Sequence, residues 1–135
     1  MVIENDCIKI TIKEDRTYTI NSVDNKQYDS IFNPFKYTRN DFVKTMEVVI
    51  QNKFTEEIRI GIIGSIYGDD SQCAVLKDKE LLILIDRDIY VIDIDEYRLV
   101  KYQNIECTGT NFAIYLIDNG YIIYGELEIV QMVFT

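Results

Sequence analysis

The chain has 135 residues, of which 47% are hydrophobic and 27% are charged. These proportions are typical of a globular protein, which excludes a disordered chain, and the length suits a single domain over residues 1–135. The 23 acidic and 14 basic residues give a formal net charge of -9. Such a charge disfavours nucleic-acid and membrane partners, whose phosphates are anionic. It favours basic proteins, cationic ligands or metal ions as partners, and it also suits a protein that is acidic for solubility alone.

The N-terminal part of the chain begins with a strand pattern. Residues 7–12 alternate between apolar and polar side chains, which predicts a half-buried strand, and residues 17–20 predict a second strand paired with it. Residues 23–37 are polar and irregular but carry four aromatic side chains, so we expect a loop that packs on the core.

Residues 39–52 change to a helical period. Apolar side chains recur there at steps of one, three and four residues, which is typical of one face of a helix. Thr38 and Asp41 resemble a capping box, and Asn52 suits a helix end. The run 47–50 is also rich in strand-forming residues. The period predicts one helix over residues 39–52, formed around Phe42, Val43, Met46, Val49 and Ile50.

Beyond Phe54 the pattern predicts strands throughout. Residues 81–85 and 89–92 are apolar at every position, which indicates that both faces of these strands are covered. Asn119-Gly120 between two apolar runs predicts a hairpin. Residues 82–90 resemble residues 114–122, as two hairpins of a meander would. The fold class expected is α+β and mostly β: an antiparallel meander of about eight to ten strands with one helix packed on it.

The absence of histidine excludes the commonest catalytic bases and the commonest transition-metal ligand. Cys7, Cys73 and Cys107 are odd in number and lack the paired spacing of a zinc site, so we expect reduced thiols, no metal and no cofactor. The acidic N-terminus does not resemble a signal peptide, and no apolar run has the length of a membrane span. These features together predict a cytoplasmic protein that is not an enzyme.

Acidic residues concentrate between residues 69 and 96, where nine acids stand against three bases. Paired carboxylates can serve hydrolysis or bind divalent cations, but Asp is also a preferred turn residue. These acids could form a negative rim that attracts a basic partner, or they could keep apolar strands soluble. The candidate partner-binding residues are Tyr67, Asp69, Asp70, Asp86, Asp88, Tyr90, Asp93, Asp95 and Glu96.

Tyrosines beside acids are typical of a surface that binds proteins, since the rings anchor the partner and the acids steer it. The leading hypothesis is an immunity or antitoxin-like inhibitor of a basic partner, such as a nuclease toxin. The alternative is a structural or assembly module that forms a homodimer through a sheet face or edge. That alternative predicts an exposed apolar patch and needs no negative rim.

Overall fold

The computed structural model describes residues 1–54, 56–67, 69–105 and 109–134. These residues divide into two compact units, which we call the N-terminal unit (Val2–Ile66) and the C-terminal unit (Tyr67 onward, with Met1). The expectation of a single domain over the whole chain stays a prediction. Each unit is described by itself.

The N-terminal unit is one five-stranded sheet with the order β1-β2-β4-β5-β3. All neighbouring strands are antiparallel except β3 and β5, which run parallel. Alternate residues of β2, β4 and β5 bury their side chains on one face, as Ile12, Val48 and Ile60 do in one row. The strands are β1 (Val2–Glu4), β2 (Ile8–Asp15), β3 (Ser30–Phe32), β4 (Val43–Asn52) and β5 (Glu57–Ser65).

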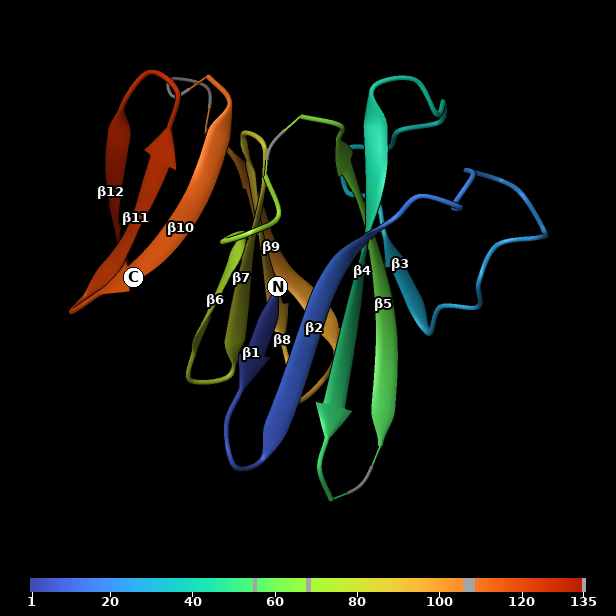
Figure 1. Ribbon diagram of the computed structural model, residues 1–135, viewed down its shortest axis with the longest axis horizontal. Helices are drawn as coiled ribbons and strands as arrows, with labels where there is room; N and C mark the ends of the chain where they lie inside the picture. The colour runs from blue at the N-terminus through green and yellow to red at the C-terminus, as the bar shows by residue number, and fades with distance from the viewer. Residues whose placement is uncertain (55, 68, 106–108, 135) are drawn as a thin grey trace. The chain divides into compact units, whose positions relative to one another are not determined.

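The C-terminal unit contains two antiparallel meanders, which Figure 1 shows as separate sheets. The four-stranded sheet has the order β6-β7-β8-β9, and the three-stranded sheet has the order β10-β11-β12. The strands of the first are β6 (Ala74–Lys77), β7 (Glu80–Ile85), β8 (Asp88–Asp93) and β9 (Arg98–Asn104). The strands of the second are β10 (Asn111–Ile117), β11 (Gly120–Gly125) and β12 (Ile129–Val133).

The two sheets of the C-terminal unit share one hydrophobic core. Leu82 and Leu84 of β7 belong to the same buried cluster as Ile114 of β10 and Ile123 of β11. The alternate side chains of β7 and β8, such as Ile83 and Ile92, are buried as well. Both faces of these strands are therefore covered, as their continuous apolar sequence predicts.

The two similar sequence stretches form equivalent structures. Residues 82–90 lie in the hairpin β7–β8, and residues 114–122 lie in the hairpin β10–β11. Two-residue turns close both hairpins, at Asp86-Arg87 and at Asp118-Asn119. Asp86 has a φ of 55°, a left-handed conformation that Asp tolerates better than most residues.

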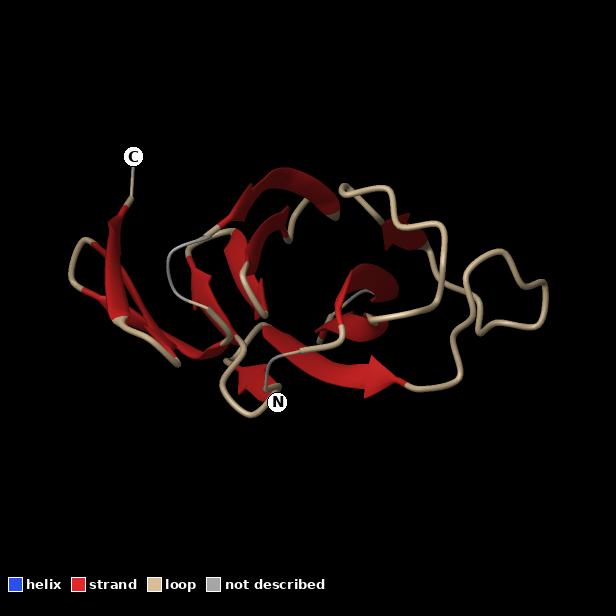
Figure 2. Ribbon diagram, turned by 90° about the horizontal axis from the view of Figure 1, so that it is seen from above, coloured by secondary structure: helices blue, strands red, loops and turns tan. Residues whose placement is uncertain are grey.

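The expected α+β class with one helix is wrong. The described residues form twelve strands in three sheets. Figure 2 shows strands and loops without a helix, so the described structure is all-β. The strand count also exceeds the eight to ten expected. Within the described residues there is, in particular, no helix of the length and apolarity needed to cross a membrane.

The helix expected over residues 39–52 is mostly strand β4. This strand lies between β2 and β5, so it is hydrogen-bonded along both of its edges. Met46, Val48 and Ile50 are buried on one face, while Thr45 and Glu47 are buried on the other. Burial on both faces places apolar residues at adjacent positions, and this breaks the strict alternation that normally identifies a strand.

Two further expectations concern the N-terminal half and the cysteines. Residues 17–20 form no strand, because β2 runs on to Asp15 and pairs with β1 and β4 instead. Cys7 is exposed and Cys73 is buried, and neither forms a disulfide bond. Cys107 lies outside the described residues.

Candidate functional site

The partner-binding residues predicted from the sequence fall into two groups at opposite ends of the β6–β9 sheet. Asp86 and Asp88 lie at the β7–β8 turn, and the run 93–96 lies at the β8–β9 turn. The six residues of β8 separate these turns by about 17 Å. Asp69 and Asp70 precede β6. Because the start of β6 pairs with the end of β7, these two acids belong to the same end of the sheet as Asp86.

Three of the predicted residues are buried. Asp86 and Asp88 are each 5% exposed, and Tyr90 is fully buried within β8. The Asn104 side chain donates a hydrogen bond of 2.7 Å to Asp88, and the Asn111 side chain donates one of 2.8 Å to the backbone carbonyl of Asp86. These contacts hold Asp86 and Asp88 in the interior of the unit, whereas Arg87 between them is exposed.

Burial raises the pKa of Asp88 above its usual value. The hydrogen bond from Asn104 opposes this increase, and the nearby carboxylate of Asp86 adds to it. Among the described residues, one buried carboxylate oxygen of Asp86 and the side-chain carbonyl oxygen of Asn111 have no hydrogen-bond partner. Two buried acceptors without a donor make this turn costly to fold, so it is a weak point of the structure.

The acids at the other end of the sheet are engaged in local contacts. Asp93 accepts hydrogen bonds from the backbone N–H groups of Glu96 and Asp95, which lower its pKa. Asp95 forms an ion pair of 3.0 Å with Lys79, and Glu96 forms one of 2.7 Å with Arg98. Turn geometry and neighbouring cations therefore account for these three carboxylates.

Of the predicted set, Tyr67, Asp69, Asp70, Asp95 and Glu96 are the residues that the structure leaves exposed. The four acids do not form one surface, because Asp69 and Asp70 precede β6 at one end of the sheet and Asp95 and Glu96 lie at the other. Asp69 also accepts a hydrogen bond from the backbone of Ser71, which is a turn contact.

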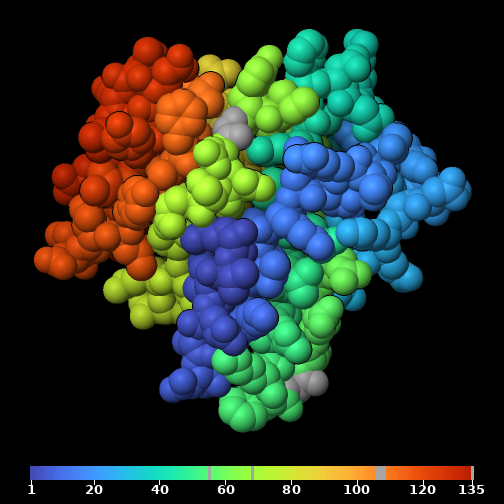
Figure 3. Space-filling view, viewed as in Figure 1, coloured from blue at the N-terminus to red at the C-terminus, as the bar shows by residue number. Residues whose placement is uncertain are grey.

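A different surface combines exposed tyrosines with acids. In the register of β10–β12, Tyr115 lies beside Ile122, and Tyr124 lies beside Ile129, all on the face that points away from the core. Tyr115 is 50% exposed, Tyr124 52% and Ile129 61%. We call this surface the outer face. Figure 3 shows that residues of this sheet, in orange and red, lie at the surface of the molecule.

The charged residues in the two turns that join β10, β11 and β12 are all acidic, and the three strands themselves carry no charged residue. Asp118 lies in the β10–β11 turn, and Glu126 and Glu128 lie at the β11–β12 turn. Residues 102–135 contain no Lys or Arg. The excess of acidic residues in the sequence lies between residues 69 and 96 and did not point to this region, because the region contains few acids. The signal that could have found it is the absence of bases beside alternating aromatic and aliphatic residues.

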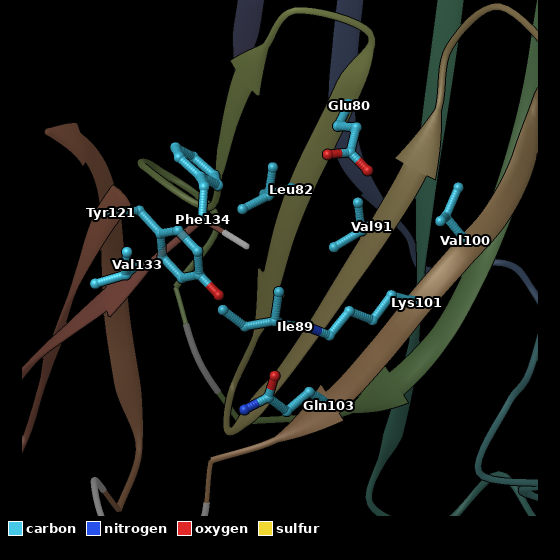
Figure 4. A pocket seen from close by; sticks show the side chains of 10 residues that line it. All are labelled: Glu80, Leu82, Ile89, Val91, Val100, Lys101, Gln103, Tyr121, Val133 and Phe134. Atoms are coloured by element: carbon cyan, nitrogen blue, oxygen red, sulfur yellow. The ribbon is translucent and has the colours of Figure 1, made fainter. Parts of the chain in front are cut away.

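The two sheets of the C-terminal unit also enclose a cleft. They meet along one side, where the Ile114 backbone N–H donates a hydrogen bond of 3.0 Å to the Gln72 carbonyl. On the other side, β9 and β12 are both edge strands. The cleft has a volume of about 120 Å³, and its lining comes from β7, β8, β9, β11, β12 and Phe134 (Figure 4).

The walls of the cleft are mainly aliphatic and aromatic, with four polar side chains among them. Leu82, Ile89 and Val91 line it on the four-stranded sheet. Tyr121 packs against Phe134, with ring centroids 5.6 Å apart, on the other sheet. The polar groups are those of Glu80, Lys101, Gln103 and Tyr121.

In the N-terminal unit, the structure reveals a buried carboxylate within the segment that the sequence predicts to be a helix. Glu47 is 2% exposed and lies 3.0 Å from Lys26, 3.7 Å from Lys13 and 3.8 Å from Arg59. Lys13 on β2 and Arg59 on β5 come from the two strands that flank β4. Lys26 comes from the segment between β2 and β3. The three cations compensate the buried charge, so the cluster stabilises the sheet.

The chain was compared with known proteins. No protein-family model, no curated protein and no solved structure matches it.

Proposed function

We propose that the protein is a non-enzymatic binding domain for a basic partner protein, and that the partner docks on the outer face of β10–β12. An immunity-type inhibitor of a cationic toxin, such as a nuclease, is the concrete form of this proposal. The observation that carries it is the half-exposed pair Tyr115 and Tyr124 within a segment that has acids and no bases.

The chemistry of the outer face suits this role. Tyrosine buries a large ring at a low cost in conformational entropy, and it is enriched among the residues that dominate binding energy. Asp118 and Glu128 lie at the two ends of the strands, so a partner's Lys or Arg side chains would meet negative charge on either side. Such complementary charges increase the rate of association.

Self-association through the same face is the second candidate, since its exposed apolar side chains resemble a dimer surface. The charges argue against it. Two copies would bring Asp118, Glu126 and Glu128 of each chain toward the same acids with no base from residues 102–135 to neutralise them. Like charges across an interface are unfavourable, so the structure favours a basic partner over a second copy.

The test is capture of a partner from the native source at low salt, followed by elution with increasing salt. We expect a single basic protein, lost when Tyr115 and Tyr124 are both changed to Ser and weakened when Asp118 and Glu128 are reversed to Lys. The matched control reverses Asp95 and Glu96 to Lys at the β8–β9 turn and should retain the partner.

Two results would contradict the proposal. Equal recovery by the tyrosine variant and the unaltered protein would remove the outer face from the interaction. Recovery of the protein alone, together with a dimer in analytical ultracentrifugation that the tyrosine variant abolishes, would support the assembly module instead.

A further inference from the structure

We propose that the cleft between the two sheets of the C-terminal unit binds a small zwitterionic molecule, with an ammonium and a carboxylate at opposite ends of a short alkyl chain. This site lies on the inner faces of the sheets, whereas the proposed protein-binding surface lies on the outer face. The inference therefore goes beyond the proposed function and does not depend on it.

The first argument is the state of the polar side chains in the cleft. The Tyr121 side chain is 8% exposed, and its hydroxyl is not among the buried polar atoms that lack a partner, so the ring is buried while the hydroxyl stays accessible. Figure 4 shows this hydroxyl directed into the cleft. An accessible hydroxyl on a buried ring can donate a hydrogen bond to a molecule bound in the cleft.

The second argument concerns charge. Glu80 and Lys101 both line the cleft, and neither forms an ion pair in the part of the chain that the structure describes. Gln103, which also lines it, makes no side-chain hydrogen bond there. In Figure 4 the ammonium of Lys101 and the hydroxyl of Tyr121 point toward Ile89, whereas Glu80 lies at the opposite end. Donors therefore gather at one end and an acceptor stands at the other.

A β-bulge explains how β9 supplies these groups. Val91 pairs with Lys101 but Ile92 pairs with Leu99, so Val100 is an extra residue in β9. The extra residue lets Val100 and Lys101, which are adjacent in sequence, both line the cleft. Bulges often redirect a side chain in this way beside functional sites.

The register of the sheet sets the size of the ligand. Glu80 lies two residues from Leu82, which pairs with Val91, and Val91 pairs with Lys101. Two residue rises and two strand spacings place the Cα atoms of Glu80 and Lys101 about 12 Å apart. Both side chains reach into the cleft, which leaves room for a short alkyl chain along Leu82 and Val91. The volume of about 120 Å³ is close to that of a cavity known to hold benzene, about 150 Å³.

The assignment of roles follows from these positions. Lys101 and the Tyr121 hydroxyl bind the carboxylate, Glu80 binds the ammonium, and the aliphatic walls cover the chain between them. An α-amino acid alone would fit poorly, because its two charges are adjacent and could not reach both ends of the cleft.

The experiment is a titration of the full chain with 6-aminohexanoate, followed by backbone amide chemical shifts in NMR and by calorimetry. Hexanoate and hexylamine serve as probes that each lack one charged end. We expect shifts confined to the residues that line the cleft, with the zwitterion bound at least about 10-fold more tightly than either probe.

The variants separate the roles of the residues. Lys101→Met and Glu80→Gln should each weaken binding about 10-fold or more, because each removes a charge-assisted contact. Tyr121→Phe should weaken it about 5-fold, the effect of one hydrogen bond, while the near-identical shape preserves the fold. Lys77→Met, at the exposed β6–β7 turn, is the matched control and should bind as the unaltered protein does.

The inference is overturned if the cleft residues show no shift at roughly 10 mM zwitterion, a concentration that detects even weak binding. It is equally overturned if Lys101→Met and Glu80→Gln bind as tightly as the Lys77→Met control. Binding of hexanoate as tight as that of the zwitterion would remove Glu80 from the site and would also refute it.

Discussion

The side chain of Asn104 donates a hydrogen bond of 2.7 Å to the carboxylate of Asp88, its direct cross-strand partner on β8 and β9. Asp88 is 95% buried in terms of accessible surface, and no described cation forms an ion pair with it. The carboxyl group of Asp88 is therefore held inside the C-terminal unit, and the pH determines whether it is ionised or protonated there.

Asp88→Asn should stabilise the protein at neutral pH. Burial raises the pKa of Asp88 in the folded state above the ordinary Asp value of 3.8. Between the unfolded and the folded pKa, the folded state therefore binds more protons than the unfolded state. Stability contributed by this group is present below the unfolded pKa and falls as pH rises through the folded pKa. Asparagine carries no charge and its carbonyl can still accept the bond from Asn104.

Urea unfolding at several pH values measures this prediction. The variant should exceed the unaltered protein by on the order of 1 kcal/mol at pH 7, a usual size for one substitution. The difference should vanish once the pH is below the unfolded pKa of Asp88. A difference that stays constant across the whole range would show that charge is not its cause.

Tyr28→Phe should destabilise the N-terminal unit. The Tyr28 hydroxyl donates a hydrogen bond of 2.6 Å to Asp15, which is 5% exposed. Burial alone would raise the pKa of Asp15, but hydrogen bonds from Thr17 and Tyr28 outweigh it and lower the pKa overall. Loss of a bond to a charged group costs about 1.5–3 kcal/mol.

The pH dependence gives a second readout for this variant. A lowered folded pKa means that Asp15 contributes stability above its unfolded pKa and loses it as pH falls through the folded pKa. Tyr28→Phe should therefore flatten the acid side of the stability curve. Tyr18→Phe, whose ring packs edge-on against Tyr28, is the control and should leave that side unchanged.

Glu47→Gln should lower the free energy of unfolding by about 1–3 kcal/mol, because the change leaves three cations close together without their anion. The cost stays below that of a fully buried unpaired charge, since the side chains of Lys13, Lys26 and Arg59 are 60%, 42% and 37% exposed and can be solvated. Chemical denaturation measures it. Lys26→Met should cost less than about 1 kcal/mol, as partly exposed ion pairs do. Equal costs for the two variants would contradict the central role of Glu47.

Gly120→Ala should be more destabilising than Gly61→Ala. A Cβ at Gly120 would overlap the backbone carbonyl of Met132 on β12, which cannot move without disrupting the β11–β12 pairing. A Cβ at Gly61 would lie 2.6 Å from Cδ1 of Ile31, the end of a flexible side chain that can shift. We expect a loss of about 2 kcal/mol or more for Gly120→Ala and about 1 kcal/mol for Gly61→Ala. Thermal unfolding of both variants measures the difference, and the reverse order would contradict the prediction.

Much of the C-terminal unit could be predicted from the sequence. The short turns at Asp86-Arg87 and Asp118-Asn119 separate apolar runs of strand length, so the hairpins β7–β8 and β10–β11 follow from local chemistry. The position of the acids at strand ends also follows from the preference of Asp for turns. The expected binding surface required more than this, because local sequence does not reveal which turns face solvent.

The sequence by itself determined that this protein forms many strands joined by acidic turns, since strand periodicity and turn residues act over a few neighbouring positions. Tertiary structure decided that Val43–Asn52 is a central strand, since it pairs with β2 and β5 along its edges and is buried on both faces, which removes the alternation. It also decided that Asp88 is buried, that Glu47 lies among three cations, and that Tyr121 meets Lys101 in one cleft. These relationships join residues far apart in the chain, and their energies depend on burial and long-range contacts that no local pattern encodes.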